Sequence, residues 1–119
     1  VHRGEHWKVV LGELPELMLK YDCSHSYARG QDYIGELNEW MPRVAHMHIK
    51  GTTCVNGQHV DAPPAGLDSI AWSTVFALIY RYGYDGGLSI EPHSSVWQGE
   101  LGERGVDFTI DFIRKYMLR

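Results

Sequence analysis

Three short apolar runs in this 119-residue chain each end in a pair of polar residues made only of histidine and carboxylate side chains. The runs lie at about 17–22, 43–50 and 88–91, and longer segments with apolar residues at every third or fourth position separate them. Strand-like runs that alternate with helical segments are typical of βα units built around a parallel sheet. The polar pairs are Asp22 with His25, His46 with His48, and Glu91 with His93.

The segments between these runs predict helices. Apolar spacing indicates helices at about 5–14, 32–41, 68–82 and 103–117. Asp32 is expected to cap the second helix, and Asp68 or Ser69 the third. Residues 51–67 are rich in Gly, Pro, Asn and Asp and are expected to form one long loop, which in a compact domain is often functional.

The polar strand ends predict a metal site. Catalytic groups of β/α barrels gather at the carboxyl ends of the strands, and alternation along a strand places His46 and His48 on one face. We therefore expect Asp22, His48 and Glu91 to bind a divalent ion, which Mn²⁺, Zn²⁺, Mg²⁺ or Co²⁺ would all suit. The structural alternatives are that Asp22 caps a turn and that His48 is a satisfied barrel histidine. A buried Glu91 would in any case need a partner.

Such an ion would allow isomerase or epimerase chemistry on a sugar. It would polarise a carbonyl or hydroxyl and stabilise an enediolate, while a nearby carboxylate moves a proton between adjacent carbons. Glu91 and His25 are the candidate catalytic residues. His25, Lys50 and Trp72 are the candidate substrate contacts, although core packing is the stronger expectation for Trp72. His46 is expected to be structural or to support the ligands.

Four stretches of the chain resemble the xylose isomerase-like barrel superfamily, which contains sugar and sugar-phosphate isomerases and epimerases as well as abasic-site endonucleases of the endonuclease-four type. They are Asp22-Cys-Ser-His25, Ala45-His-Met-His48-Ile-Lys50-Gly51, Ala62-Pro-Pro-Ala-Gly66-Leu-Asp68-Ser-Ile70-Ala-Trp72, and Tyr82-Gly-Tyr84-Asp-Gly86 with Ser89-Ile-Glu91-Pro92. The resemblance implies that Asp22, His48 and Glu91 match three of four metal ligands of the epimerase branch. It also implies that Glu91 is one of two acid/base carboxylates and that His25 touches the substrate.

The chain departs from this pattern in two ways. Gly51 stands where an aspartate is usual, and Ala65 stands where a glycine is common, with Asp68 one place away from its usual position. A complete barrel also needs about 250 residues. We therefore expect residues 1–119 to form one partial TIM-barrel domain that holds the last three strands. Either the chain is a C-terminal fragment of a longer product that contains the N-terminal half, or it forms a homo-oligomer that hides its sheet edges.

Two other functions are compatible with the sequence, namely a metal-dependent nuclease acting at abasic DNA and a catalytically incomplete domain that only oligomerises. The formal net charge of −4, with scattered Lys and Arg, argues against nucleic acid as a partner. No apolar run approaches the roughly 20 residues of a membrane span, so no membrane partner is expected. Cys23 and Cys54 lie in no metal-binding spacing, and two reduced thiols suit a cytoplasmic protein.

Overall fold

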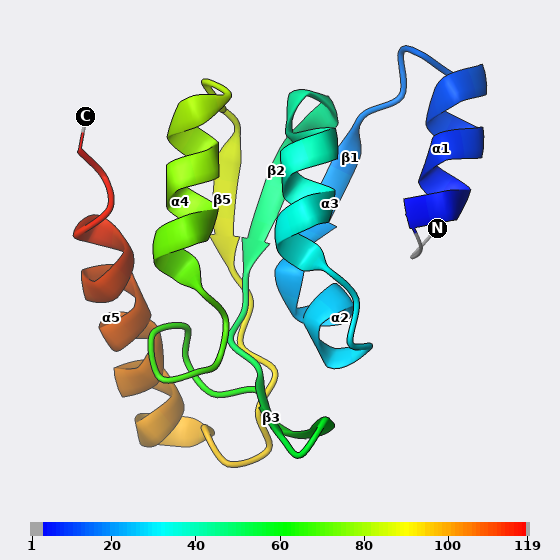
Figure 1. Ribbon diagram of the computed structural model, residues 1–119. Coiled ribbons are helices and arrows are strands. Elements are labelled where there is room, and N and C mark those ends of the chain that lie inside the picture. The colour runs from blue at the N-terminus through cyan, green and yellow to red at the C-terminus, as the bar shows by residue number, and fades with distance from the viewer. Residues whose placement is uncertain (1–3, 119) are drawn as a thin grey trace.

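A computed structural model describes residues 4–118 of the chain, with side chains from residue 8 onward (Figure 1). Helical segments separate the strands of its central sheet, as the sequence predicts. The helices are α1 (Gly4–Glu13), α2 (Cys23–Ala28), α3 (Tyr33–Trp40), α4 (Trp72–Arg81) and α5 (Gly99–Arg114), with a 3₁₀ turn at Met41–Arg43. The strands are β1 (Leu19–Asp22), β2 (Val44–Ile49), β3 (Thr53–Val55), β4 (Gln58–Asp61) and β5 (Gly87–Ile90). None of the described helices is both long and apolar enough to cross a membrane.

The central sheet has the order β1-β2-β5, and both strand pairs are parallel. Helices α3 and α4 lie across one face of it, and α5 lies beside α4 (Figure 1). Met47 and Ile49 of β2 are completely buried in the core under these helices, together with Val75 and Phe76 of α4. Because side chains alternate along a strand, His46 and His48 are left on the opposite face. The predicted α/β fold with parallel βα units is confirmed.

The segment after β2 is not the uninterrupted loop that we expected. Strands β3 and β4 form an antiparallel hairpin there. Asn56 and Gly57 at its turn both have positive φ, 52° and 78°, as an Asn-Gly hairpin turn requires. The dipeptide was a usable signal, but the flanking strands are only three and four residues long and show no clear alternation.

One helix was not predicted, and two helix starts differ from expectation. Helix α2 follows β1 directly, where the sequence predicts no helix, α5 begins four residues early at Gly99, and α4 begins only at Trp72. Asp32 does cap α3, since its carboxylate accepts a hydrogen bond from the amide of Gly35 at 2.9 Å. Asp68 caps no helix; its carboxylate accepts hydrogen bonds from two loop amides and from the Trp72 indole.

Arg43 ties α1 to the sheet. Its guanidinium donates hydrogen bonds to the carbonyl oxygens of Leu11 at 3.3 Å, Leu14 at 2.9 Å and Leu17 at 3.0 Å. These carbonyls lie at and just beyond the end of α1, where a helix leaves its last acceptors unpaired. One side chain therefore satisfies acceptors that lie 26 to 32 residues earlier in the chain.

Replacing Arg43 with methionine is expected to lower the free energy of unfolding by about 2 kcal/mol, because hydrogen bonds from a charged donor are lost while the aliphatic packing is kept. Urea titration followed by circular dichroism would measure this. Arg104→Met is the matched control, since Arg104 is exposed and forms a surface ion pair with Glu100, so a change under about 0.5 kcal/mol is expected. Equal midpoints for the two variants would contradict this account of α1.

Candidate metal centre

Asp22 ends β1 and caps α2. Its Oδ1 atom accepts hydrogen bonds from the Ser24 amide at 2.9 Å and the Ser24 hydroxyl at 2.6 Å. Its Oδ2 atom is buried and has no hydrogen-bond partner among the described residues. Burying an acceptor without a hydrogen bond costs free energy. This oxygen is therefore suited to a partner that is not a hydrogen-bond donor, such as a metal ion.

Parallel pairing brings two further ligands to Asp22. Asp22 pairs in register with His48, and Glu91 directly follows β5, where its amide bonds the Ile49 carbonyl at 3.1 Å. The Nδ1 atom of His48 lies 3.8 Å from Asp22 Oδ2 and contacts Glu91 Oε2. The three ligand atoms all lie within 4.8 Å of one another. The structure thus brings together the three residues that the sequence singles out.

This spacing fits a small divalent ion. Ligand atoms placed about 2.1 Å from a tetrahedral ion lie about 3.4 Å apart, and the atoms found here all lie within 4.8 Å of one another, with His48 Nδ1 3.8 Å from Asp22 Oδ2. Two carboxylates and one imidazole form a donor set that Zn²⁺ and Mn²⁺ accept. The Oδ2 atom of Asp22, which accepts no hydrogen bond, is the oxygen that such an ion would use.

Two predicted substrate contacts, His25 and Lys50, lie at the same carboxylate. Lys50 Nζ is 3.3 Å from Asp22 Oδ2, and the Lys50 side chain is only 12% exposed. His25 Nε2 is 3.5 Å from the same oxygen, and its ring is 51% exposed. His25 therefore lies at the solvent rim of the site, whereas Lys50 lies largely inside it.

His93, which the sequence pairs with Glu91, contacts this carboxylate from the solvent side. Its Nε2 lies 3.1 Å from Glu91 Oε1, although the His93 side chain is 58% exposed. Burial raises the pKa of the Glu91 carboxyl, but the hydrogen bond with His93 and the positive charges of His48 and Lys50 outweigh it, so that the pKa is lowered overall. Glu91 is therefore ionised at neutral pH, as a metal ligand or general base must be.

His46 lies two residues before His48 on the same face of β2 and supports the site from there. Its Nε2 lies 2.5 Å from Ser89 Oγ of β5, and its ring meets that of His48 edge to face with centroids 5.6 Å apart. A side chain at Gly87 would come within 2.9 Å of the His46 ring. His46 is thus held by β5 and packs against a candidate ligand, which agrees with the supporting role that we expected.

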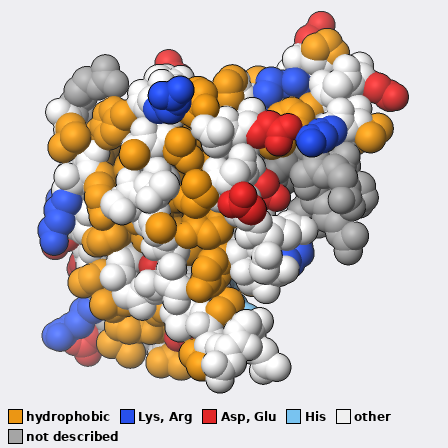
Figure 2. All heavy atoms as spheres, in the orientation of Figure 1, with side chains coloured by type: hydrophobic (Ala, Val, Ile, Leu, Met, Phe, Trp, Pro, Cys, Tyr) orange, Lys and Arg blue, Asp and Glu red, His pale blue; other side chains and the backbone are white. Residues whose placement is uncertain are grey.

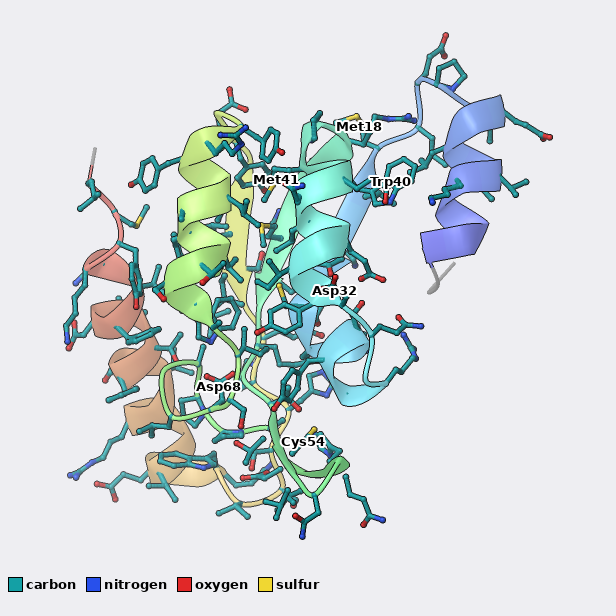
Figure 3. The ribbon with its side chains drawn as sticks, in the orientation of Figure 1. Met18, Asp32, Trp40, Met41, Cys54 and Asp68 are labelled. Atoms are coloured by element: carbon teal, nitrogen blue, oxygen red, sulfur yellow. The ribbon has the colours of Figure 1, made fainter. Side chains whose placement is uncertain are left out.

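Trp72 does not join this cluster. Its side chain is 2% exposed in the core, and its Nε1 donates to Asp68 Oδ1 at 3.0 Å. Trp72 is therefore a packing residue, which was the stronger of the two expectations for it, and its candidate substrate contact is corrected accordingly. Asp68, labelled in Figure 3, also accepts from the amides of Thr52 at 3.0 Å and Gly66 at 3.1 Å. It organises the loop after β2, a role that the sequence did not indicate.

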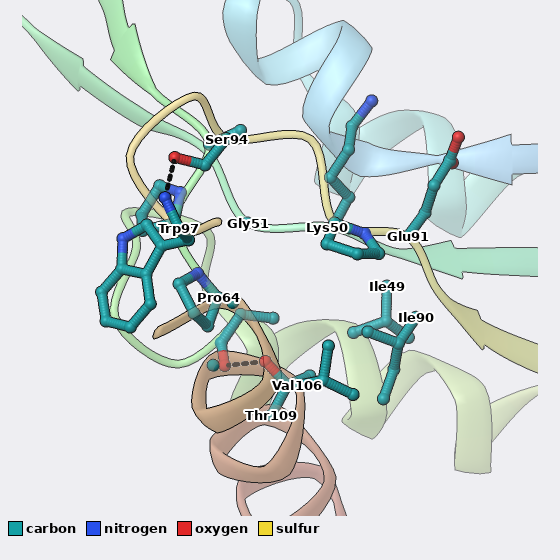
Figure 4. A pocket seen from close by; sticks show the side chains of 16 residues that line it. Ile49, Lys50, Gly51, Pro64, Ile90, Glu91, Ser94, Trp97, Val106 and Thr109 are labelled. Atoms are coloured by element: carbon teal, nitrogen blue, oxygen red, sulfur yellow. Dashed lines mark hydrogen bonds between the residues drawn. The ribbon is translucent and has the colours of Figure 1, made fainter. Parts of the chain in front are cut away.

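A pocket lies beside the cluster, between the loop after β2 and α5 (Figure 4). Its walls are mainly apolar and include Ile49, Ile90 and Val106. Figure 4 shows the Lys50 and Glu91 side chains pointing away from Ile49 and Ile90. The polar ends of the site residues therefore lie outside this pocket, which belongs to the packing of α5.

No protein-family model matches the sequence, and no curated protein matches it either. Solved structures do match its fold. A xylose isomerase domain protein from Planctomyces limnophilus matches with a TM-score of 0.80 at 13% identity over 94% of this chain. The IolI protein, whose structure holds a zinc atom, matches with 0.73 at 16% identity over 98%. The probable 3-DHS dehydratase AsbF from Bacillus anthracis, involved in petrobactin synthesis, matches with 0.66 at 16% identity over 89%.

These similarities concern the fold. The chain covers 42% of the Planctomyces structure, 44% of IolI and 42% of AsbF. It therefore has the fold of part of a xylose isomerase-like β/α barrel, as its sequence motifs predict.

Proposed function

We propose that this part of a xylose isomerase-like barrel binds one divalent ion through Asp22, His48 and Glu91 and serves a sugar isomerase or epimerase reaction. The observation that carries the proposal is the convergence of three ligand atoms within 4.8 Å, one of them an Oδ2 atom without a hydrogen bond. The zinc atom in the structurally similar IolI supports it. The two free cysteines fit a cytoplasmic setting.

The residues around the ligands have complementary roles in such a reaction. The ion, when bound, would polarise a carbonyl or hydroxyl of the sugar. Glu91 is ionised and about a third exposed, so its carboxylate can move a proton between adjacent carbons. His25, at the exposed rim, can hydrogen-bond a sugar hydroxyl.

Proton exchange tests this reaction directly. A panel of ketoses and ketose phosphates is incubated in D₂O with the Mn²⁺-loaded protein, and deuterium at the carbon next to the carbonyl is followed by NMR. We expect wild type to exchange at least one substrate and Glu91→Gln to lose about 100-fold or more of the rate. His59→Gln, an exposed substitution in the β3–β4 hairpin, is the control. Exchange that survives in Glu91→Gln would contradict the role of Glu91, and ion binding without exchange on any substrate would contradict the reaction.

We also propose that the active form is an assembly. Within residues 4–118 no strand pairs with the outer edge of β1 or of β5, and such edges readily accept another strand. Large apolar side chains on α5 are also partly exposed, such as Leu101 at 44% and Phe108 at 39%. Figure 2 shows apolar side chains across the helical face, with Lys and Arg scattered near its rim.

A second copy of the chain, or the complementary part of the barrel, would cover these edges. Light scattering after size-exclusion chromatography is expected to show this chain as a dimer or larger species. A monodisperse monomer would contradict self-assembly and favour the complementary part of the barrel as the partner.

A further inference from the structure

Lys50 and a metal ion would compete for the same oxygen atom. The Lys50 ammonium lies 3.3 Å from Asp22 Oδ2 without forming a hydrogen bond to it, and this is the carboxylate oxygen that an ion requires. Lys50 follows His48 by two residues, so the end of β2 directs both side chains to one side. Its 12% exposed side chain extends into the site and not into solvent.

The charges of the site change sign when an ion is added. With neutral histidines, Asp22, Glu91 and Lys50 together carry one net negative charge. A divalent ion converts this to one net positive charge. A divalent ion and an ammonium group repel each other strongly at the few ångströms that separate them here, so both cannot remain on Asp22 Oδ2.

We propose that Lys50 occupies the ion's place on Asp22 and is released when the ion binds, and that the freed ammonium then holds an oxyanion group of the substrate. The inference rests on the ion site proposed above and deepens it by naming the substrate class, a sugar that carries a carboxylate or phosphate. With the carboxylates engaged by the ion, the groups that remain at the mouth are Lys50, His25 and His93. All three are donors to an anion when protonated.

A permanent Lys50–Asp22 ion pair is the competing explanation, and it makes opposite predictions. In that case Lys50 would help to hold Asp22 in place, and its removal would weaken ion binding. If Lys50 competes with the ion, its removal strengthens binding. The sign of the change in ion affinity therefore separates the two.

The first experiment is calorimetric titration of Mn²⁺ into wild type, Lys50→Met and Lys8→Met. We expect Lys50→Met to bind Mn²⁺ at least tenfold more tightly than wild type and Lys8→Met to match wild type, since Lys8 is exposed on α1. Weaker or equal binding by Lys50→Met would overturn the inference. Absence of binding in both wild type and Lys50→Met would overturn the ion site as well.

The second experiment follows the released amine. Brief acetylation with trace acetic anhydride, read by peptide mass spectrometry, is expected to modify Lys50 several-fold faster with saturating Mn²⁺, whereas Lys8 and Lys115 keep their rates.

Inorganic phosphate and glycolate are then titrated into the Mn²⁺-loaded protein as phosphate and carboxylate probes. At least one should bind wild type tenfold more tightly than Lys50→Met and should slow acetylation of Lys50. Mn²⁺ bound with unchanged acetylation of Lys50 would overturn the release while leaving the ion site intact, and binding of neither anion would overturn the substrate class.

Discussion

Replacing Asp22 with asparagine is expected to lower the affinity for Mn²⁺ or Zn²⁺ by about 100-fold or more. Structural zinc sites with four ligands bind with roughly 10–16 kcal/mol, so the loss of one ligand removes on the order of 3 kcal/mol. Asparagine keeps an oxygen that can accept from Ser24, and it caps helices about as well as aspartate. The substitution therefore removes the charged Oδ2 atom with little damage to α2.

Calorimetric titration of the ion, with thermal unfolding recorded beside it, measures both effects. Asp61→Asn is the matched control, because Asp61 is a partly buried carboxylate that accepts from Ser94 at 2.7 Å and lies outside the ligand set. If Asp22→Asn bound ions as tightly as Asp61→Asn, Asp22 would not be a ligand.

Introducing aspartate at Gly51 is expected to destabilise the protein by about 3 kcal/mol or more and to leave ion binding no tighter. Gly51 is buried, and a side chain there would run into the carbonyl oxygen of Pro63 and lie 3.1 Å from the amide of Ala65. Both obstacles are backbone atoms, which cannot rotate away as the end of a flexible side chain could. Overpacking of this kind lowers the free energy of unfolding. The resemblance to xylose isomerase-like barrels implies an aspartate at this position. In this chain the loop after β2, which Asp68 organises, packs its backbone against Gly51 and leaves no space for a side chain there.

Urea unfolding of Gly51→Ala and Gly51→Asp tests this explanation, because both add the same obstructed Cβ atom. Gly12→Ala is the control, since a Cβ atom at Gly12 meets nothing within 4 Å and the residue lies in a helix. We expect Gly12→Ala to be neutral or slightly stabilising. Wild-type stability of Gly51→Asp together with tighter Mn²⁺ binding would show that the position can supply a fourth ligand.

The sequence predicts well that the polar residues at the strand ends lie close together, because a single physical rule governs their position. Parallel strands carry their carboxyl ends to one edge, so Asp22, His48 and Glu91 could be expected to meet without knowledge of the register. Alternation of side chains along β2 also predicts that His46 and His48 lie on the opposite face of the sheet from the core residues Met47 and Ile49.

The features that the sequence did not predict depend on contacts between distant residues. Asp68 could be seen as a helix cap, but its actual partners, Thr52 and Gly66, are fixed only by how the loop folds. The obstruction at Gly51 comes from Pro63, twelve residues later in the chain. The approach of Lys50 to Asp22 depends on the register between β1 and β2, which no local sequence pattern predicts.

Anomalous diffraction from crystals of the Mn²⁺- or Zn²⁺-loaded protein would test the central claim most directly. We predict one strong peak per chain, about 2.0–2.2 Å from Asp22 Oδ2, His48 Nδ1 and a Glu91 carboxylate oxygen. No peak at this position at saturating ion, or a peak bound by other side chains, would contradict the assignment of these three residues as the metal centre.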